Sequence, residues 1–348
     1  MTIVLIAIFS FSNSGLLAFS AVIFAYGLVS ILDLILPAHK YNLTKEEEDY
    51  VFNDKKYNYL LYLLPFTLLG ITFFYLHTIE NNYNSVHWST LLGWVLSCAT
   101  VTTALGAIGG HELGHRTSKF EVFLGHICDL CYCSLHRPIS HNYGHHKNVS
   151  TPIDPVSSNY NEVVYFFWFR AMIGVFIDAW RIEKRRLIAS KQPIYSLQNE
   201  VIRLTIIQLL FIALIGVIFS PLAMLFFIIS SFVTNCLHET VCYIEHYGLK
   251  RKLLNNGRYE QVMPHHSWNS EQIASRLLLF ELPRHSDHHY RASKKYQTLN
   301  HYPDVPTMPF GYAFMIALAM MPPLWFMVMN KKVEAIRLKY GPSLTETL

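Results

Sequence analysis

The chain of 348 residues is 52% hydrophobic and 14% aromatic, and only 15% of its residues are charged, whereas soluble proteins carry about 25% charged residues. This composition excludes an ordinary soluble domain and indicates a membrane protein. The net charge of +4 does not call for a nucleic-acid partner, because excess lysine and arginine on loops beside anionic membrane lipid explain it.

Apolar stretches predict the membrane-spanning helices, since about 20 helical residues cross the hydrocarbon core. The first stretch, 2–12, is short, and the residues at 13–15 allow the chain to turn back. A cleaved signal peptide is the alternative for this stretch, but no positively charged segment precedes it. The run 204–244 is too long for one crossing and divides at the Ser-Pro pair 220–221. The predicted spans are 2–12, 16–36, 58–79, 88–110, 204–219 and 222–244.

Positive charge predicts the orientation of these spans. Segment 40–57 carries four lysines, whereas 80–87 has no lysine or arginine, so the first is expected in the cytosol and the second outside. Residues 308–329 are also apolar but contain a Pro-Pro pair at 322–323, which favours a re-entrant or interfacial helix, with a seventh span as the alternative. The sequence contains no internal repeat or linker, so a single membrane domain is expected over 1–348.

Histidine is unusually frequent, and nine of the 18 histidines fall in four short clusters at 111–115, 141–146, 246 and 285–289. Spacings of three and four residues place imidazole rings on one helical face, about one turn apart. The first three clusters follow the cytosolic ends of apolar segments, so we expect them at the same depth. The clustered residues are His111, His115, His141, His145, His146, His246, His285, His288 and His289.

This pattern predicts a metal site. Nine imidazoles are too many for one zinc ion and ample for two metal ions with open coordination positions, and zinc, copper, nickel and iron all accept imidazole. The segment HELGH also matches the H-E-x-x-H motif of zinc proteases, but Ser118 and Glu121 break the metzincin extension, and seven histidines would remain unexplained. A metal transporter should instead place its ligands near mid-bilayer. Candidate acceptors for imidazole N–H groups are Glu112, Glu245, Asp287 and Asp154.

Several long motifs carry a family resemblance. They are HELGHR (111–116), HNYGHHKNVSTPIDPVSS (141–158), YIEHYGL (243–249), NGRYEQVMPHHSWNS (256–270) and LPRHSDHHYRASKKYQTL (282–299). Together they resemble the alkane 1-monooxygenases of the AlkB type, within the superfamily of membrane fatty-acid desaturases and hydroxylases. The resemblance runs from about Asp33 to Pro323. It implies an all-α integral membrane protein with about six transmembrane helices and a cytosol-facing, histidine-rich diiron domain.

The resemblance also implies the activity. The nine clustered histidines would hold two non-haem iron ions, and O2 would be the co-substrate that supplies one oxygen atom to the terminal methyl group of a linear alkane, giving a 1-alkanol. His265 and His266, although in a shared stretch, are not matched as ligands. Related diiron oxidations, namely xylene-type aryl-methyl hydroxylation and acyl desaturation, are the alternatives. Ser140, Pro283 and Cys242 differ from residues common in the family, and they leave the surroundings of the ligands and the substrate preference open.

Electrons must come from another protein, because the chain has no paired C-x-x-C motifs and no G-x-G-x-x-G motif after a strand. The resemblance implies rubredoxin with rubredoxin reductase as the donor, and a place in the bacterial inner membrane with the histidine boxes facing the cytosol. Basic residues on the expected cytosolic loops suit an acidic carrier, although the positive-inside rule alone accounts for them. They are Arg181, Lys184, Arg185, Arg186, Lys250, Arg251 and Lys252.

Overall fold

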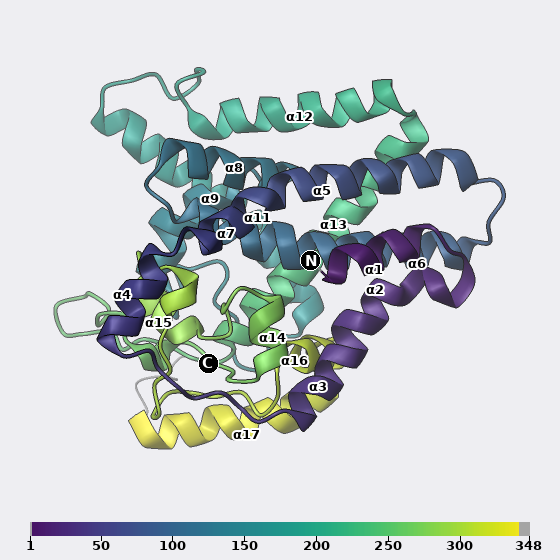
Figure 1. Cartoon of the computed structure of the whole chain (residues 1–348). Coiled ribbons are helices and arrows are strands. Elements are labelled where there is room, and N and C mark those ends of the chain that lie inside the picture. The colour runs from purple at the N-terminus through teal and green to yellow at the C-terminus, as the bar shows by residue number, and fades with distance from the viewer. Residues whose placement is uncertain (1, 341–348) are drawn as a thin grey trace. The chain divides into compact units, whose positions relative to one another are not determined.

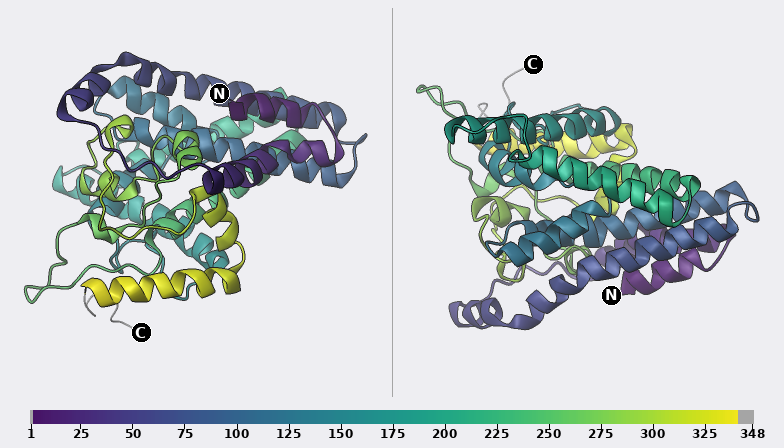
Figure 2. Two further views of the ribbon diagram at one scale, coloured as in Figure 1. Left: turned by 60° about the horizontal axis from the view of Figure 1, so that its bottom comes forward. Right: turned by 90° about the horizontal axis from the view of Figure 1, so that it is seen from above.

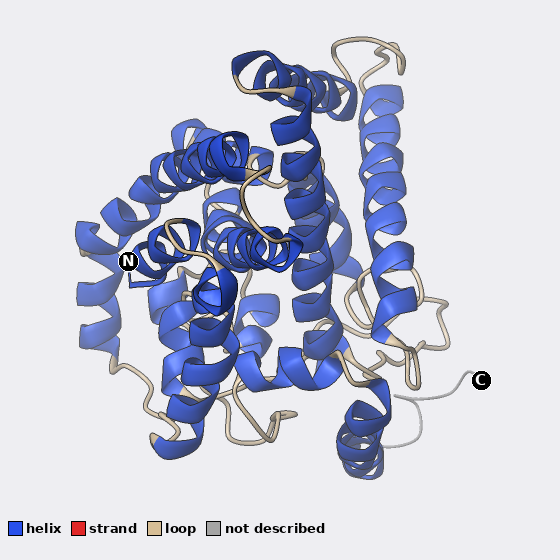
Figure 3. Cartoon of the chain, turned by 90° about the vertical axis from the view of Figure 1, so that its right-hand side faces the viewer, coloured by secondary structure: helices blue, strands red, loops and turns tan. Residues whose placement is uncertain are grey.

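The computed structural model describes residues 2–340, and within this range the chain is helical, with two isolated β-bridges and no named strand (Figure 3). The α-helices are α1 (Thr2–Phe11), α2 (Ser20–Val22), α3 (Val29–Ile35), α4 (Lys45–Asn53), α5 (Lys55–Asn82), α6 (Trp88–Val101), α7 (Gly110–Gly114), α8 (Lys119–Leu130), α9 (Arg137–Ser140), α10 (His146–Asn148), α11 (Val164–Ala189), α12 (Glu200–Ile218), α13 (Pro221–His246), α14 (Ile273–Leu278), α15 (His285–Tyr290), α16 (Tyr312–Ala319) and α17 (Pro322–Tyr340). Three π-helical segments, η2 (Ile23–Leu28), η3 (Thr102–Gly109) and η4 (His141–His145), interrupt or extend these helices.

Five continuous helical stretches are long and apolar enough to cross a membrane. They are Gly15–Ile35, Lys55–Asn82, Trp88–Gly114, Glu200–Ile218 and Pro221–His246, and each coincides within a few residues with a predicted span. The fold is therefore that of an all-α integral membrane protein. The predicted span 2–12 forms a helix of 10 residues, and its crossing remains a prediction.

The apolar stretch 308–329 is divided where the prolines predicted a break. Helix α16 ends at Ala319 and α17 starts at Pro322, a position where proline's missing N–H is no loss to a helix. The re-entrant or interfacial placement of this stretch remains a prediction.

The described residues form two compact units. Unit 1 holds 2–29, 54–138 and 179–238, and unit 2 holds 30–53, 139–178 and 239–340. Helices α11 and α13 each pass from one unit into the other. A single domain over the whole chain remains a prediction.

In unit 1, α1 packs against α5 and α6 (Figure 1). The indole N–H of Trp94 donates to the carbonyl oxygens of Ser10 and Asn13, at 3.0 and 2.9 Å, and fixes the turn after α1 on α6. Helix α8 packs against α7, which carries the first histidine cluster. A Cβ at Gly110 would lie 2.5 Å from the Cβ of Cys128, so only glycine permits this close approach.

In unit 2, the last turns of α13 pack against α17, the long C-terminal helix drawn in yellow (Figure 2). The ring of Trp325 lies 5.2 Å from the rings of both Tyr243 and Tyr247. Just after α13 the chain turns at Gly248, which has φ +69° and a neighbour, Val333, that leaves no room for a Cβ. This packing fixes the end of α13, where His246 lies.

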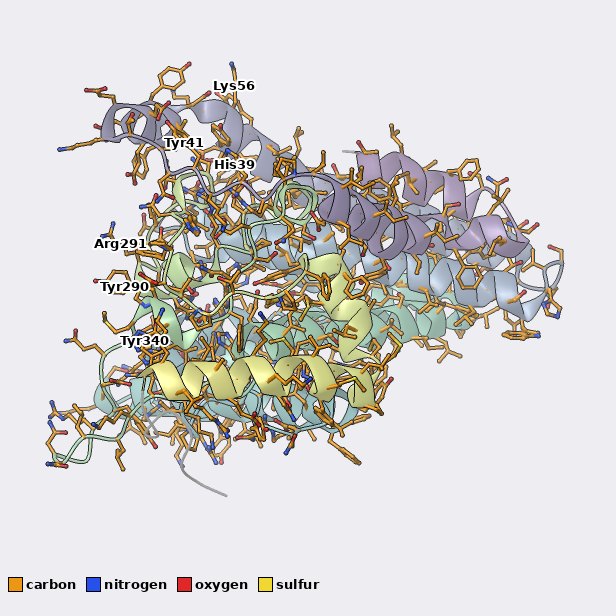
Figure 4. All side chains as sticks on the ribbon, turned by 90° about the horizontal axis from the view of Figure 1, so that it is seen from below. His39, Tyr41, Lys56, Tyr290, Arg291 and Tyr340 are labelled. Carbon is orange, nitrogen blue, oxygen red and sulfur yellow. The ribbon has the colours of Figure 1, made fainter. Side chains whose placement is uncertain are left out.

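A second contact in unit 2 fixes the short helix α15. Its preceding residue, Arg284, is 4% exposed and donates to the carbonyl oxygens of Tyr41 at 2.8 Å and His39 at 3.2 Å. Both acceptors lie on the segment before α4, where their rings are 6.1 Å apart (Figure 4). The guanidinium also donates to the carbonyl oxygen of Leu299, so one buried cation joins three separate chain segments at the start of α15.

Candidate metal centre

Four buried histidines of unit 2 form one group, which we call the four-histidine set: His145, His246, His285 and His289. The Nε2 atoms of His145 and His289 are 3.2 Å apart, as are those of His246 and His285. The Nε2 atoms of His285 and His289 are 2.9 Å apart. The i,i+4 spacing on α15 thus brings these last two rings onto one face.

The donor chemistry of this set fits a metal ion. Two nitrogens bound to one metal at about 2.1 Å and at right angles lie about 3.0 Å apart, which agrees with the observed separations. Burial, together with the neighbouring histidines, lowers the pKa of His289 well below its usual range, so this ring is neutral at physiological pH. Several neutral rings that direct the same nitrogen at one point are stabilised by a shared cation.

A second group in unit 2, the three-histidine set, contains His141, His146 and His288, whose ligand atoms lie within 4.8 Å of one another. The Nε2 atoms of His141 and His146 are 3.0 Å apart, and the rings of His146 and His288 are 4.8 Å apart. His141 and His146 are five residues apart in sequence. They face one another because η4 is π-helical, and its i to i+5 hydrogen bonds align residues at this spacing.

The sequence pattern did not predict this division. Helical spacing predicted that His141 lies beside His145, and that His285 lies beside both His288 and His289. The structure instead places His145 and His285 in the four-histidine set and His141 and His288 in the three-histidine set. Histidines of the same sequence cluster therefore belong to different spatial groups.

The remaining two clustered histidines belong to unit 1. His111 lies on α7 and His115 follows it, and their Nε2 atoms are 3.0 Å apart. This is the predicted i,i+4 geometry. Between them, Glu112 forms an ion pair with Arg116 at 2.7 Å, and both side chains are almost fully buried.

Among the candidate carboxylates, Asp154 contacts an imidazole directly. Its Oδ2 atom accepts from Nδ1 of His145 at 2.8 Å and from the hydroxyl of Ser157 at 2.6 Å. Burial favours a raised pKa for Asp154, but the charge and hydrogen bond of His145 and the hydroxyl of Ser157 outweigh it and lower the pKa. The ionised carboxylate keeps the proton on Nδ1 and leaves the Nε2 lone pair free for a metal.

Glu245 and Asp287 have other surroundings. Glu245 Oε2 lies 3.3 Å from His285 Nε2, the nitrogen that faces the rest of the set. Asp287 accepts from the backbone N–H of Asn300 at 2.7 Å, the hydroxyl of Tyr302 at 2.8 Å and the ammonium of Lys294 at 3.2 Å. Asp287 thus binds the segment after α15 to the helix that carries three of the histidines.

A third group, Glu260, His265 and His266, also brings possible metal ligands together, but its hydrogen bonds argue against a metal. Nδ1 of His266 accepts from the backbone N–H of Met263 at 2.9 Å, so the proton of the neutral ring is on Nε2, which faces Glu260 at 3.1 Å. Burial, with the charges of His265 and Arg251, lowers the pKa of His266 to about 3. Its nitrogens are therefore occupied in holding the loop.

An all-α membrane fold with clustered histidines is the class of protein that this structure defines, and comparison with known proteins gives its family. The fatty acid desaturase family model matches residues 86–327. The chain belongs to the alkane 1-monooxygenase family: it is 39% identical over 318 residues to alkane 1-monooxygenase 1 of Pseudomonas aeruginosa, a match covering 91% of this chain and 83% of the relative. It is 34% identical over 311 residues to alkane 1-monooxygenase of Ectopseudomonas oleovorans, covering 88% and 76%.

A more distant relative is the xylene/toluene monooxygenase hydroxylase component of Pseudomonas putida, which is 27% identical over 239 residues, covering 69% of this chain and 63% of the relative. These matches confirm the resemblance inferred from the histidine motifs. The protein is therefore an integral membrane enzyme of this family.

Proposed function

We propose that the protein is a membrane non-haem diiron monooxygenase that inserts one oxygen atom from O2 into the terminal methyl group of linear alkanes to give 1-alkanols. The observation that carries this proposal is the convergence of imidazole Nε2 atoms at separations of 2.9–3.2 Å. When bound there, two iron ions supply the activation of O2, which acid–base groups alone cannot perform on an unpolarised C–H bond.

We assign the nine clustered histidines as the iron ligands. The four-histidine set would hold one ion. The three-histidine set of unit 2 and the pair His111 and His115 of unit 1 are the remaining candidate ligands. The first assignment is supported by the burial of the set and by its Nε2 separations of 2.9–3.2 Å. The others are supported by the 3.0 Å Nε2 separation within each of the pairs His141–His146 and His111–His115.

The surrounding side chains orient these ligands. Asp154 fixes the tautomer of His145, and Asp287 secures α15 through Lys294 and Tyr302. Burial of the four-histidine set keeps water from the reacting centre. Glu245, at 3.3 Å from the Nε2 of His285, is placed to hold or accept a proton beside that nitrogen.

The wider setting follows from the family. We propose that electrons arrive from rubredoxin, reduced by rubredoxin reductase, and that the histidine boxes face the cytosol from the bacterial inner membrane. The apolar substrate would enter from the lipid. The lack of lysine and arginine in 80–87, against four lysines in 40–57, supports this orientation.

The test is turnover of the iron-loaded protein with rubredoxin and its reductase under labelled O2, using linear alkanes, toluene and an acyl substrate. We expect labelled 1-alkanols, two iron ions per chain by elemental analysis, and loss of both product and about half of the iron in His285→Ala. His87→Ala, at the exposed start of α6, is the control and should retain both. If alkanes are not oxidised but toluene is hydroxylated, the result would favour the aryl-methyl alternative. If alkanes are not oxidised but the acyl chain is desaturated, the result would favour the acyl alternative.

A further inference from the structure

A basic surface of unit 1 lies outside the metal centre. The segment 179–203, which joins the end of α11 to the start of α12, contains six lysine and arginine residues and two glutamates. Both glutamates pair within the segment: Glu183 with Arg186 at 2.6 Å and Glu200 with Arg203 at 3.9 Å. Four exposed cations therefore remain in excess of these pairs: Arg181, Lys184, Arg185 and Lys191.

The same segment exposes large apolar side chains. Tyr195 is 84% exposed, Leu197 66% and Ile188 57%. The ring of Tyr195 lies 6.1 Å from that of Trp180, so the loop bends back to α11, which carries three of the cations. Cationic and apolar groups thus share one short surface.

The segment leads directly into a membrane span. Helix α12 starts at Glu200, and only 17% of its apolar window is buried inside the protein, against 83% for Trp88–Gly114. The outer faces of α12 therefore meet lipid along most of its length. The basic segment directly precedes this span in the sequence, so in a membrane it would adjoin the lipid headgroups.

We propose that the segment 179–199 is a docking surface for anionic phospholipid headgroups, with the four excess cations contacting phosphate and Ile188, Tyr195 and Leu197 entering the interface. A bilayer surface offers negative charge and apolar chains within a few ångströms, and basic and aromatic side chains are enriched there. An acidic protein carrier would explain the cations, but it would leave the three exposed apolar side chains in water.

The test uses the full-length, detergent-purified protein titrated with dioctanoyl phosphatidylglycerol, with dioctanoyl phosphatidylcholine as the uncharged comparison. The thermal unfolding midpoint is the readout. Each cation near an anionic surface contributes about fivefold in affinity, so Lys184→Gln/Arg185→Gln should raise the half-saturating phosphatidylglycerol concentration by about 25-fold. Both side chains are exposed, so the midpoint without lipid should not change.

Two controls separate charge from fold. Lys252→Gln/Arg258→Gln removes two exposed cations elsewhere and should leave the titration unchanged, and Lys184→Arg/Arg185→Lys should bind as the parent does. Equal stabilisation by the two lipids, or an unchanged titration in the Lys184→Gln/Arg185→Gln variant, would overturn the proposal. So would a raised KM for reduced rubredoxin in that variant without a change in lipid binding, which would assign the surface to the electron carrier.

Discussion

Asp129 allows a direct test of how burial of a carboxyl group changes its pKa and the stability of the protein. This residue of α8 is 4% exposed, and its Oδ1 accepts from the hydroxyl of Tyr132 at 2.8 Å. Burial raises the pKa of Asp129 to about 7, although the Tyr132 hydrogen bond and the charge of Arg137 act in the opposite direction. We expect Asp129→Asn to stabilise the protein at alkaline pH, because the amide accepts the same hydrogen bond without a buried charge.

The magnitude follows from the pKa change. A rise from 3.8 to about 7 corresponds to about 4 kcal/mol at about 1.4 kcal/mol per pKa unit. The folded state holds this proton more tightly than the unfolded state, so the free energy of unfolding decreases as pH rises from about 4 to about 7 and is then constant. The free energy of unfolding of Asp129→Asn should therefore exceed that of the parent by about 4 kcal/mol at pH 8 and by about 2 kcal/mol at pH 5.

The assay is denaturant or thermal unfolding of both proteins in detergent at the two pH values. Asp49→Asn, at an exposed site on α4, is the control and should give no pH-dependent difference. A variant of Asp129 that is less stable than the parent at pH 8, or a difference that is equal at both pH values, would refute this account of the buried carboxyl.

Three further changes have distinct expected outcomes. Asp154→Ala should weaken metal binding about 10- to 100-fold in chelator competition, because His145 loses the acceptor that fixes its tautomer; unchanged affinity would contradict this role. Gly311→Ala should lower the free energy of unfolding by about 1–3 kcal/mol, because its Cβ would overlap the Asp33 carboxylate; an unchanged midpoint would show that this carboxylate can move. Asn199→Ala should lower the free energy of unfolding by about 1 kcal/mol, through loss of the cap that accepts from the N–H groups of Val201 and Ile202. Asn199→Asp keeps this acceptor but loses the Nδ2 donor to the carbonyl oxygen of Ile194 at 3.1 Å, so it should retain only part of the stability.

The sequence predicted the membrane helices well because length and apolar content determine them. The break before α17 was also predictable, since Pro322 and Pro323 cannot continue a helix from α16. The pairing of His111 with His115 followed from ordinary helical spacing. These features depend on neighbouring residues along the chain, so they can be predicted from the sequence.

The grouping within the later histidine boxes could not be predicted in the same way. His141 faces His146 because η4 is π-helical, and nothing in the residues 141–146 marks a change from α-helical geometry. The hydrogen-bond and ion-pair partners of Asp287 could not be predicted for another reason. Lys294, Asn300 and Tyr302 reach it only because the chain folds back over α15.

The π-helical segment η3 has a consequence for insertions and deletions. It lies between the apolar helix α6 and the tip that carries His111 and His115, and such segments contain an additional residue relative to an α-helix. Removing one residue from Thr102–Gly109 would remove this additional residue and leave an α-helix that carries the two histidines in about the same direction. Removing one residue from α6 would instead turn the tip by about 100° relative to the start of α6. The geometry of the pair and its direction are therefore separable properties, and the π-helical segment is a point at which the chain length can change by one residue with both retained.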